Sequence, residues 1–131
     1  MITDHIDPPG LAMIPGSANV VVATGAKLVS VSGQTGADED GKVAGTTHLD
    51  QARRALENLR SALHAGGATA ADVIKLTIYV VDYSDAALEA LMTAAIEVFG
   101  DDYPVTASTL IGVATLWQPD VLVEIDALAM V

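Results

Sequence analysis

The chain has 131 residues, of which 51% are hydrophobic, and this is enough apolar material for one compact domain. Six basic and seventeen acidic residues leave a formal net charge of −11, which repels a phosphate backbone and argues against a nucleic-acid partner. The chain has no cysteine, so disulfides, thiolate nucleophiles and cysteine-ligated metals are excluded.

The first 18 residues are expected to form an irregular lead-in, because Pro8, Pro9 and Pro15 interrupt them. This segment has neither the basic start nor the apolar centre of a secretory signal, and no later segment is apolar enough to span a bilayer. The sequence therefore predicts a cytoplasmic protein with no membrane partner. A mean hydropathy of +0.43 is high for a small chain and favours a buried subunit interface.

The first half of the chain predicts two strands followed by a helix. β-Branched runs at 20–24 and 27–32 flank Gly25-Ala26, a pattern typical of a hairpin. A polar, acidic loop is expected at 36–45. An amphipathic helix then begins near Thr47 and stops at Gly66-Gly67. Its apolar residues recur at steps of three and four: Leu49, Ala52, Leu56, Leu59 and Leu63.

The second half predicts three more strands and another helix. Residues 73–81 alternate as a strand, with Ile74, Leu76, Ile78 and Val80 on one face and Lys75, Thr77 and Tyr79 on the other. Ser84 is expected to cap a helix that ends at Gly100, and strands follow at 107–114 and 121–131. We therefore expect one α+β domain over 1–131, of order ββαβαββ, with both helices on one face of a single mixed sheet.

Three patterns that suggest ligand sites are incomplete. Residues 36–42 have the glycine and lysine spacing of a phosphate loop, but Val43 stands where a hydroxyl should bind magnesium. A calcium loop starting at Asp38 would need glycine at Val43 and glutamate at Leu49. The three histidines are too widely spaced to present two ligands on one helix turn. We expect no metal site.

The last strand carries a more informative charge. Glu124 and Asp126 lie on the face opposite Val123 and Ile125, because side chains alternate along a strand. A solvated sheet face is the simple interpretation. However, the same face also carries Leu122, Leu128 and Met130, which favours a covered interface. Glu124 would then be a shielded general base.

Several segments taken together resemble the RidA/YjgF family, from about Gly16 to Ala129. The matching segments are Ser32-Gly33-Gln34, Gln51, Asn58-Leu59, 73–82 and 124–129, the last similar to the family's closing Glu-Ile-Glu-Ala-Ile-Ala. The resemblance implies a chorismate-mutase-like fold and a homotrimer that binds a small metabolite without a cofactor. It also implies hydrolysis of reactive enamines and imines at clefts between subunits.

The resemblance assigns site residues but leaves one role empty. It implies that Glu124 positions the attacking water, and that Ser17, Ser32, Gly33, Ser108 and Thr109 bind the substrate. Active relatives clamp the substrate carboxylate with an arginine, which is Ser108 here in one register and Thr106 in the other. The only arginines, Arg53, Arg54 and Arg60, are expected on the far side of the sheet. Lys75 could substitute if it reaches the cleft, although a rim or interface lysine is the simpler interpretation.

The sequence thus leaves two functions open. One is an enamine or imine deaminase whose activity is weakened or redirected by Ser108, so whether the chain is an enzyme is undecided. The other is a non-catalytic metabolite-binding or interaction protein on the same trimer. Ribonuclease activity, assigned to some relatives, is disfavoured by the charge of −11.

Overall fold

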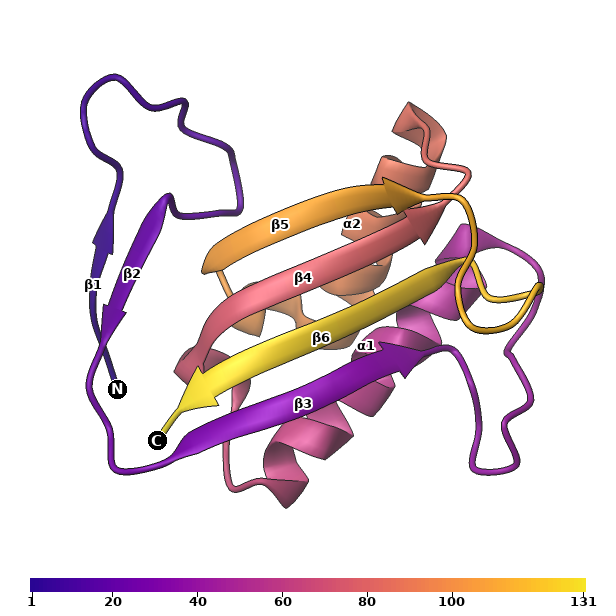
Figure 1. Cartoon of the computed structure of the whole chain (residues 1–131), viewed down its shortest axis with the longest axis horizontal. Coiled ribbons are helices and arrows are strands. Elements are labelled where there is room, and N and C mark those ends of the chain that lie inside the picture. The colour runs from indigo at the N-terminus through magenta and orange to yellow at the C-terminus, as the bar shows by residue number, and fades with distance from the viewer.

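The computed structural model describes all 131 residues and has a four-stranded sheet with two helices on one face (Figure 1). The strand order in this sheet is β3-β6-β4-β5. Only β4 and β5 run parallel, so the sheet is mixed. The strands are β3 (Leu28–Thr35), β4 (Val73–Val81), β5 (Ala107–Val113) and β6 (Val123–Met130). The predicted α+β architecture is confirmed.

The two long helices begin at the predicted caps. Helix α1 (His48–Ala65) follows Thr47, whose side chain accepts a hydrogen bond from the Asp50 amide at 3.1 Å. Helix α2 (Asp85–Phe99) follows Ser84, whose hydroxyl accepts from the Ala87 amide at 3.1 Å. Each cap satisfies an amide that the first helical turn leaves without a partner. Short 3₁₀ turns, η1 (Ala70–Asp72) and η2 (Gly100–Asp102), follow the two helices.

Strand β6 shows how the sheet divides into two faces. Its residues alternate strictly between buried and half-buried, and the buried set packs in the core against the helices: Val123, Ile125, Ala127 and Ala129. Glu124 and Asp126 therefore lie on the face away from the helices, as predicted. We call this second face the open face. Glu124 pairs with Tyr79 across β4, and Asp126 pairs with Thr77.

One predicted strand face is wrong at its first residue. Val73, not Ile74, is fully buried in the core, because the β4–β6 register shifts between Val73 and Lys75. A bulge of this kind places two residues of one strand against one of its partner and changes which side chain points inward. Beyond it, Leu76 and Val80 are buried as the alternation predicted.

The predicted hairpin between 20–24 and 27–32 is also wrong. Strand β2 (Val20–Ala23) pairs with β1 (Ile2–Ile6), which lies in the expected irregular lead-in, and these two strands form a separate sheet. The β1–β2 hairpin stands at the end of the main sheet (Figure 1). The amides of Ala26 and Lys27 instead donate to the carbonyl of Val131, so this connection leads the chain away from β2 to pair with β6.

The 36–45 segment is a loop, as predicted, and its own geometry argues against a phosphate site. The Asp38 carboxylate accepts hydrogen bonds from the amides of Asp40 and Lys42, both at 2.9 Å. The amides that a phosphate loop would offer to an anion are thus already used by a side chain of the loop. No group of three or more metal-ligating side chains is present in the structure.

Candidate functional site

Two carboxylates and a phenol gather at one end of the open face. Glu124 and Asp126 come from β6, and Tyr79 lies on β4 directly opposite Glu124. The Tyr79 hydroxyl donates to the Asp126 carboxylate at 3.2 Å. We call these three residues the carboxylate cluster. Sequence analysis placed Tyr79 on this face but missed its connection to the acids, although its alternation with Lys75 and Thr77 was the available signal.

The environment of the carboxylate cluster disfavours further negative charge. Burial raises the pKa of Glu124 above its ordinary value, and the neighbouring charge of Asp126 raises it further. The charge of Asp126 is also the main cause that raises the pKa of Tyr79, followed by burial. Glu124 therefore holds a proton more readily than a solvated glutamate, which suits a group that must both accept and return one.

A glycine on β3 makes room for the Glu124 side chain. The register between β3 and β6 shifts between Val31 and Gln34, so Ser32 and Gly33 both lie opposite Asp126. A Cβ atom added to Gly33 would stand 2.1 Å from Oε1 of Glu124 and 2.7 Å from its Cδ. The bulge thus brings the β3 backbone against the carboxyl group, and only glycine leaves that space free.

The other predicted substrate-binding residues lie at the opposite end of the sheet, near the start of β5. Thr109 pairs with Thr77 on the open face, whereas Ser108 pairs with Leu76, which is buried on the helix face. Ser17, Lys75 and Ser108 line a small pocket of about 160 Å³ beside the start of β5. Its remaining lining residues are Ile14, Ala18, Asn19 and Ala107, and we call it the serine pocket. Thr109 does not line it, but its hydroxyl accepts a hydrogen bond from Lys75 Nζ at 2.7 Å.

Within one chain, the predicted site residues therefore form two groups. Ser32 and Gly33 adjoin the carboxylate cluster, whereas Ser17 and Ser108 line the serine pocket. Tyr79 and Lys75 mark these two groups on β4, and four residues of strand separate them, which is about 13 Å. The structure does not bring Glu124 and Ser108 together in a single chain.

Neither of the two residues that align with the family's arginine, Ser108 and Thr106, is a cation. Thr106 is fully buried, and its hydroxyl has no hydrogen-bond partner. Ser108 is partly exposed beside the serine pocket. The arginines are on α1, where Arg53 pairs with Asp50 and Glu97 and Arg60 donates to the Val98 carbonyl at 2.7 Å. They lie in the helix layer, as predicted, away from the open face.

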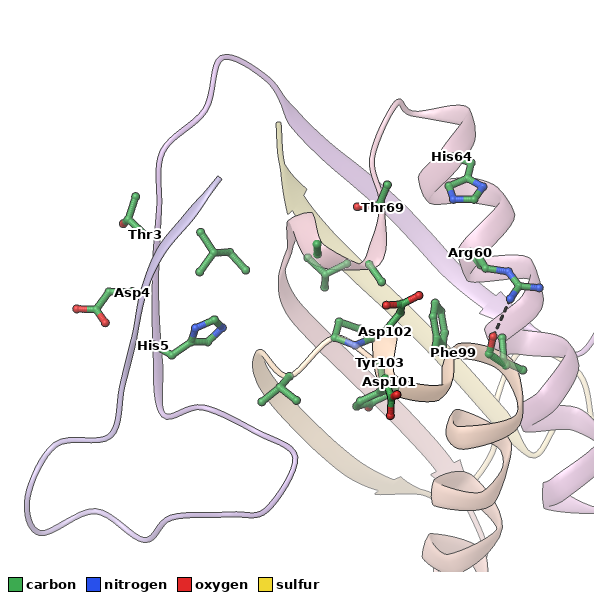
Figure 2. Close-up of a pocket in the computed structure, with 17 residues that line it drawn as sticks. Thr3, Asp4, His5, Arg60, His64, Thr69, Phe99, Asp101, Asp102 and Tyr103 are labelled. Carbon is green, nitrogen blue, oxygen red and sulfur yellow. Dashed lines mark hydrogen bonds between the residues drawn. The ribbon is translucent and has the colours of Figure 1, made fainter.

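A cavity larger than the serine pocket, of about 1000 Å³, lies elsewhere. It separates β1 from the C-terminal ends of the two helices and from η2 (Figure 2). The His5 ring points toward it, while Thr3 and Asp4 point away (Figure 2). Arg60 and His64 line its far side. None of the predicted site residues lines it, and neither does any residue of the carboxylate cluster.

None of the helices has the length and apolar character that crossing a bilayer requires.

Comparison with known proteins gives consistent matches. The family model described as Endoribonuclease L-PSP matches residues 15–131. A 2-iminobutanoate/2-iminopropanoate deaminase of Salmonella typhimurium is 32% identical over 105 residues, which are 79% of this chain and 79% of that protein. A RutC family protein of Pyrococcus horikoshii is 37% identical over 100 residues, covering 76% and 75% of the two chains.

Solved structures agree with this assignment. A conserved Rid family protein of unknown function, YyfB from Yersinia pestis, has a TM-score of 0.85 at 31% identity and covers 98% of both chains. TdcF of E. coli, solved with bound serine, has a TM-score of 0.70 at 26% identity and covers 92% of this chain and 91% of its own. Sequence, fold and family model converge, and the chain belongs to the RidA/YjgF family.

Proposed function

We propose that this protein hydrolyses small reactive imines, and enamines after their tautomerisation, to a carbonyl compound and ammonia. The observation that carries the proposal is Glu124, which is half-buried on the open face beside Gly33 with its pKa raised by burial and by Asp126. Relatives named as 2-iminobutanoate/2-iminopropanoate deaminase support the same reaction class.

The reaction requires only water and a group that moves protons. The substrate reacts as its protonated iminium form: as the water oxygen attacks the iminium carbon, the Glu124 carboxylate takes a proton from that water, which gives a neutral carbinolamine. Glu124 then donates this proton to the nitrogen, the carbon–nitrogen bond breaks, and ammonia leaves. The Glu124 carboxylate takes the hydroxyl proton as the carbonyl forms, and it passes that proton to ammonia or solvent. A raised pKa suits both halves, since it makes the carboxylate a better base and makes the acid form more accessible than in a solvated glutamate.

The neighbours of Glu124 have supporting roles in this proposal. Gly33 allows the carboxyl group to lie over the β3 backbone, and Ser32 and Gly33 offer backbone groups to the substrate. Tyr79 holds Asp126 by the 3.2 Å hydrogen bond, which fixes the charge next to Glu124. The result is a positioned acid–base group rather than a freely rotating one.

We further propose that the complete site forms between copies of the chain in a homotrimer. A substrate of a few heavy atoms cannot reach from the carboxylate cluster to the serine pocket across about 13 Å of strand. A cleft between copies would set the cluster of one chain against the pocket of the next. Exposed apolar side chains on the edge strands β3 and β5, Leu28, Leu110 and Ile111, support a covered surface. Sedimentation equilibrium should give three times the chain mass, and a monomer at assay concentrations would contradict this assembly.

The deaminase proposal is tested by ammonia release from 2-iminopropionate generated in the assay by an amino-acid oxidase. Glu124→Gln should lower kcat/KM by at least about a hundredfold, since general acid–base catalysis contributes 10² to 10⁴. Glu89→Gln, an exposed glutamate on α2, is the matched control and should behave like the wild type. Equal rates in all three proteins, indistinguishable from the uncatalysed rate, would reject the enzyme.

One observation favours a second function. No cation lies in the carboxylate cluster, and neither Ser108 nor Thr106 replaces the arginine that active relatives use. The alternative is a protein that binds a metabolite without converting it. A compound that raises the melting temperature and is recovered unchanged would support this alternative.

A further inference from the structure

The carboxylate cluster lies where three strands end close together. Strand β6 begins at Val123, beside the last residues of β3 and β4, because β6 runs antiparallel to both. Thr35, the last residue of β3, pairs directly with Glu124. A side chain so near the end of its strand is positioned only as well as the backbone around it is held. The groups that hold these strand ends therefore bear on Glu124.

A buried amide of helix α1 holds the chain that enters β6. Gln51 is fully buried, and its Oε1 accepts a hydrogen bond from the Leu122 amide at 2.8 Å, two residues before Glu124. Its Nε2 donates to the carbonyls of Asp120 at 2.8 Å and Gly45 at 3.3 Å. The start of β6 is thus tied to the helix by a side chain that water does not reach.

A second amide of α1 holds the end of β3. Asn58 follows Gln51 by seven residues, which is about two helical turns, so both side chains lie on the same face of α1. Asn58 Nδ2 donates to the carbonyls of Thr35 at 2.9 Å and Ala37 at 2.8 Å. Because Thr35 is the pairing partner of Glu124, one of these bonds holds the backbone directly beside the acid.

The same helix also bonds the end of β4. His48 Nε2 lies 2.7 Å from the carbonyl oxygen of Val81, the last residue of β4, and donates to it. The Val81 amide in turn donates to the Leu122 carbonyl at 2.9 Å. The chain leaving β3 passes so close to α1 that a Cβ added to Gly36 would stand 3.0 Å from Gln51 Cα. Helix α1 therefore bonds the backbone at the ends of all three strands around the carboxylate cluster.

We propose that α1 is the positioning element of the carboxylate cluster, and that Gln51 and Asn58 are positioning residues that hold Glu124 against the β3 backbone. Both act through backbone groups from the helix layer, so neither is a catalytic residue. The expected effect on catalysis rests on the deaminase function proposed above. The expected effect on the ionisation of Glu124 does not, because it is measured without substrate.

The first test is the pKa of Glu124, measured by carboxyl NMR on the full-length protein. The titratable groups beside Glu124 are Asp126 on β6 and Tyr79 on β4, and β3 contributes none. Asn58→Ala leaves these groups in place, and alanine is the better helix former, so α1 is retained. The variant frees the end of β3 and lets water reach the carboxyl group. The pKa of Glu124 should therefore fall from its raised wild-type value towards the ordinary 4.5.

Three further variants separate positioning from stability. Leu63→Ala removes a fully buried side chain near the C-terminal end of α1, so it should lower the melting temperature at least as much as Asn58→Ala but leave the pKa of Glu124 unchanged. Asn58→Gln keeps both N–H groups and should hold this pKa closer to the wild-type value than Asn58→Ala does. Gln51→Asn is one methylene too short to reach the Leu122 amide, and it should shift the pKa in the same direction as Asn58→Ala.

The second test is ammonia release from 2-iminopropionate. Asn58→Ala should lower kcat and kcat/KM alike by about ten- to hundredfold, since misplacing a catalytic group by about 1 Å can cost on the order of a hundredfold. An unchanged pKa of Glu124 in Asn58→Ala, or an equal shift in Leu63→Ala, overturns the positioning role whatever the activity. The expected pKa shift in a protein that releases no ammonia leaves the positioning role in place and rejects the deaminase function instead.

Discussion

Replacing Gly33 with alanine should displace Glu124 without removing it. The new Cβ would stand 2.1 Å from Oε1, and ordinary contact begins at 3.4 Å, so the carboxyl group must retreat by about 1.3 Å. Gly33 does not have a positive φ, so its backbone accepts alanine without strain. Displacing a catalytic group by about 1 Å can cost on the order of a hundredfold in rate. We expect Gly33→Ala to lower kcat/KM by about that factor.

The same substitution should barely change stability. The atoms that must move belong to the end of a flexible side chain, and an off-rotamer adjustment costs about 0.5–1.5 kcal/mol. Alanine also restricts the unfolded chain, which offsets about 0.4–1 kcal/mol. Urea denaturation should therefore place Gly33→Ala within about 1 kcal/mol of wild type.

The assay is ammonia release from 2-iminopropionate, with Gly112→Ala as the matched control. Gly112 is also a strand glycine, but its added Cβ would meet Tyr83 Cβ at 3.3 Å and the Val80 carbonyl oxygen at 4.0 Å, and no atom of Glu124. The double variant Gly33→Ala with Glu124→Gln should be no slower than Glu124→Gln alone, since both act on one group. Wild-type activity in Gly33→Ala would refute the reasoning, because Glu124 would then have worked from a displaced position.

Three other substitutions test separate parts of the structure. Gln51→Leu should cost about 2–6 kcal/mol by urea denaturation, because this fully buried amide bonds the carbonyl of Asp120 at 2.8 Å and the amide of Leu122 at 2.8 Å, and each group left without a partner costs about 1–3 kcal/mol. Glu124→Gln should melt at a higher temperature than wild type at pH 7.5 but not below about pH 4. The pKa of Glu124 is higher in the folded protein than the ordinary value of 4.5, so wild-type stability falls as pH rises from 4.5 through the folded-state pKa. Glutamine does not ionise, so the variant does not lose this stability. Equal melting temperatures of the two proteins at pH 7.5 would contradict the prediction. The pKa of Asp7 is lowered, first by the Asn19 amide and then by the Asn19 side chain, so this contact stabilises the loop above pH 3.8 and is lost as pH falls through the folded pKa. The Asn19 amide shift should therefore titrate below pH 3.8 in NMR spectra of wild type and stay flat in Asp7→Ala.

Local signals were sufficient for the helix starts and for the inner face of β6. Thr47 and Ser84 cap the helices as their residue types indicate, and the strict alternation of β6 separates Ile125 from Glu124 as periodicity requires. These features depend on neighbours within a few residues along the chain, so local sequence patterns predict them.

Features set by distant pairing could not be read in the same way. Whether 20–23 pairs with 28–35 or with 2–6 depends on which strand β6 accepts as a neighbour, and the carbonyl of Val131 decides this by binding Ala26 and Lys27. The bulges at Val73 and Gly33 likewise follow from the register with β6. Local alternation carries no information about such shifts.

The sequence proposed candidate site residues one by one but gave no arrangement for them. The roles of Glu124, Ser32 and Gly33 came from resemblance to the RidA/YjgF family, and the structure brings these three close together. The position of Lys75 beside Ser17 and Ser108 joins segments almost 100 residues apart, through a pocket that only the folded chain creates.

The separate pairing of β1 with β2 has a consequence for how the protein opens. These strands hydrogen-bond to each other. Their connections to the rest of the molecule include the Met1 amino group, which bonds the Met130 carbonyl, the amides of Ala26 and Lys27, which bond the Val131 carbonyl, and the bridge between Ser17 and Thr106. Deuterium should therefore replace the amide protons of β1 and β2 well before those of β4 and β6, since local unfolding of this unit breaks only these few hydrogen bonds to the rest of the chain. Ser17 lies in the connection between β1 and β2 and lines the serine pocket, so we expect opening of this unit to open the pocket as well.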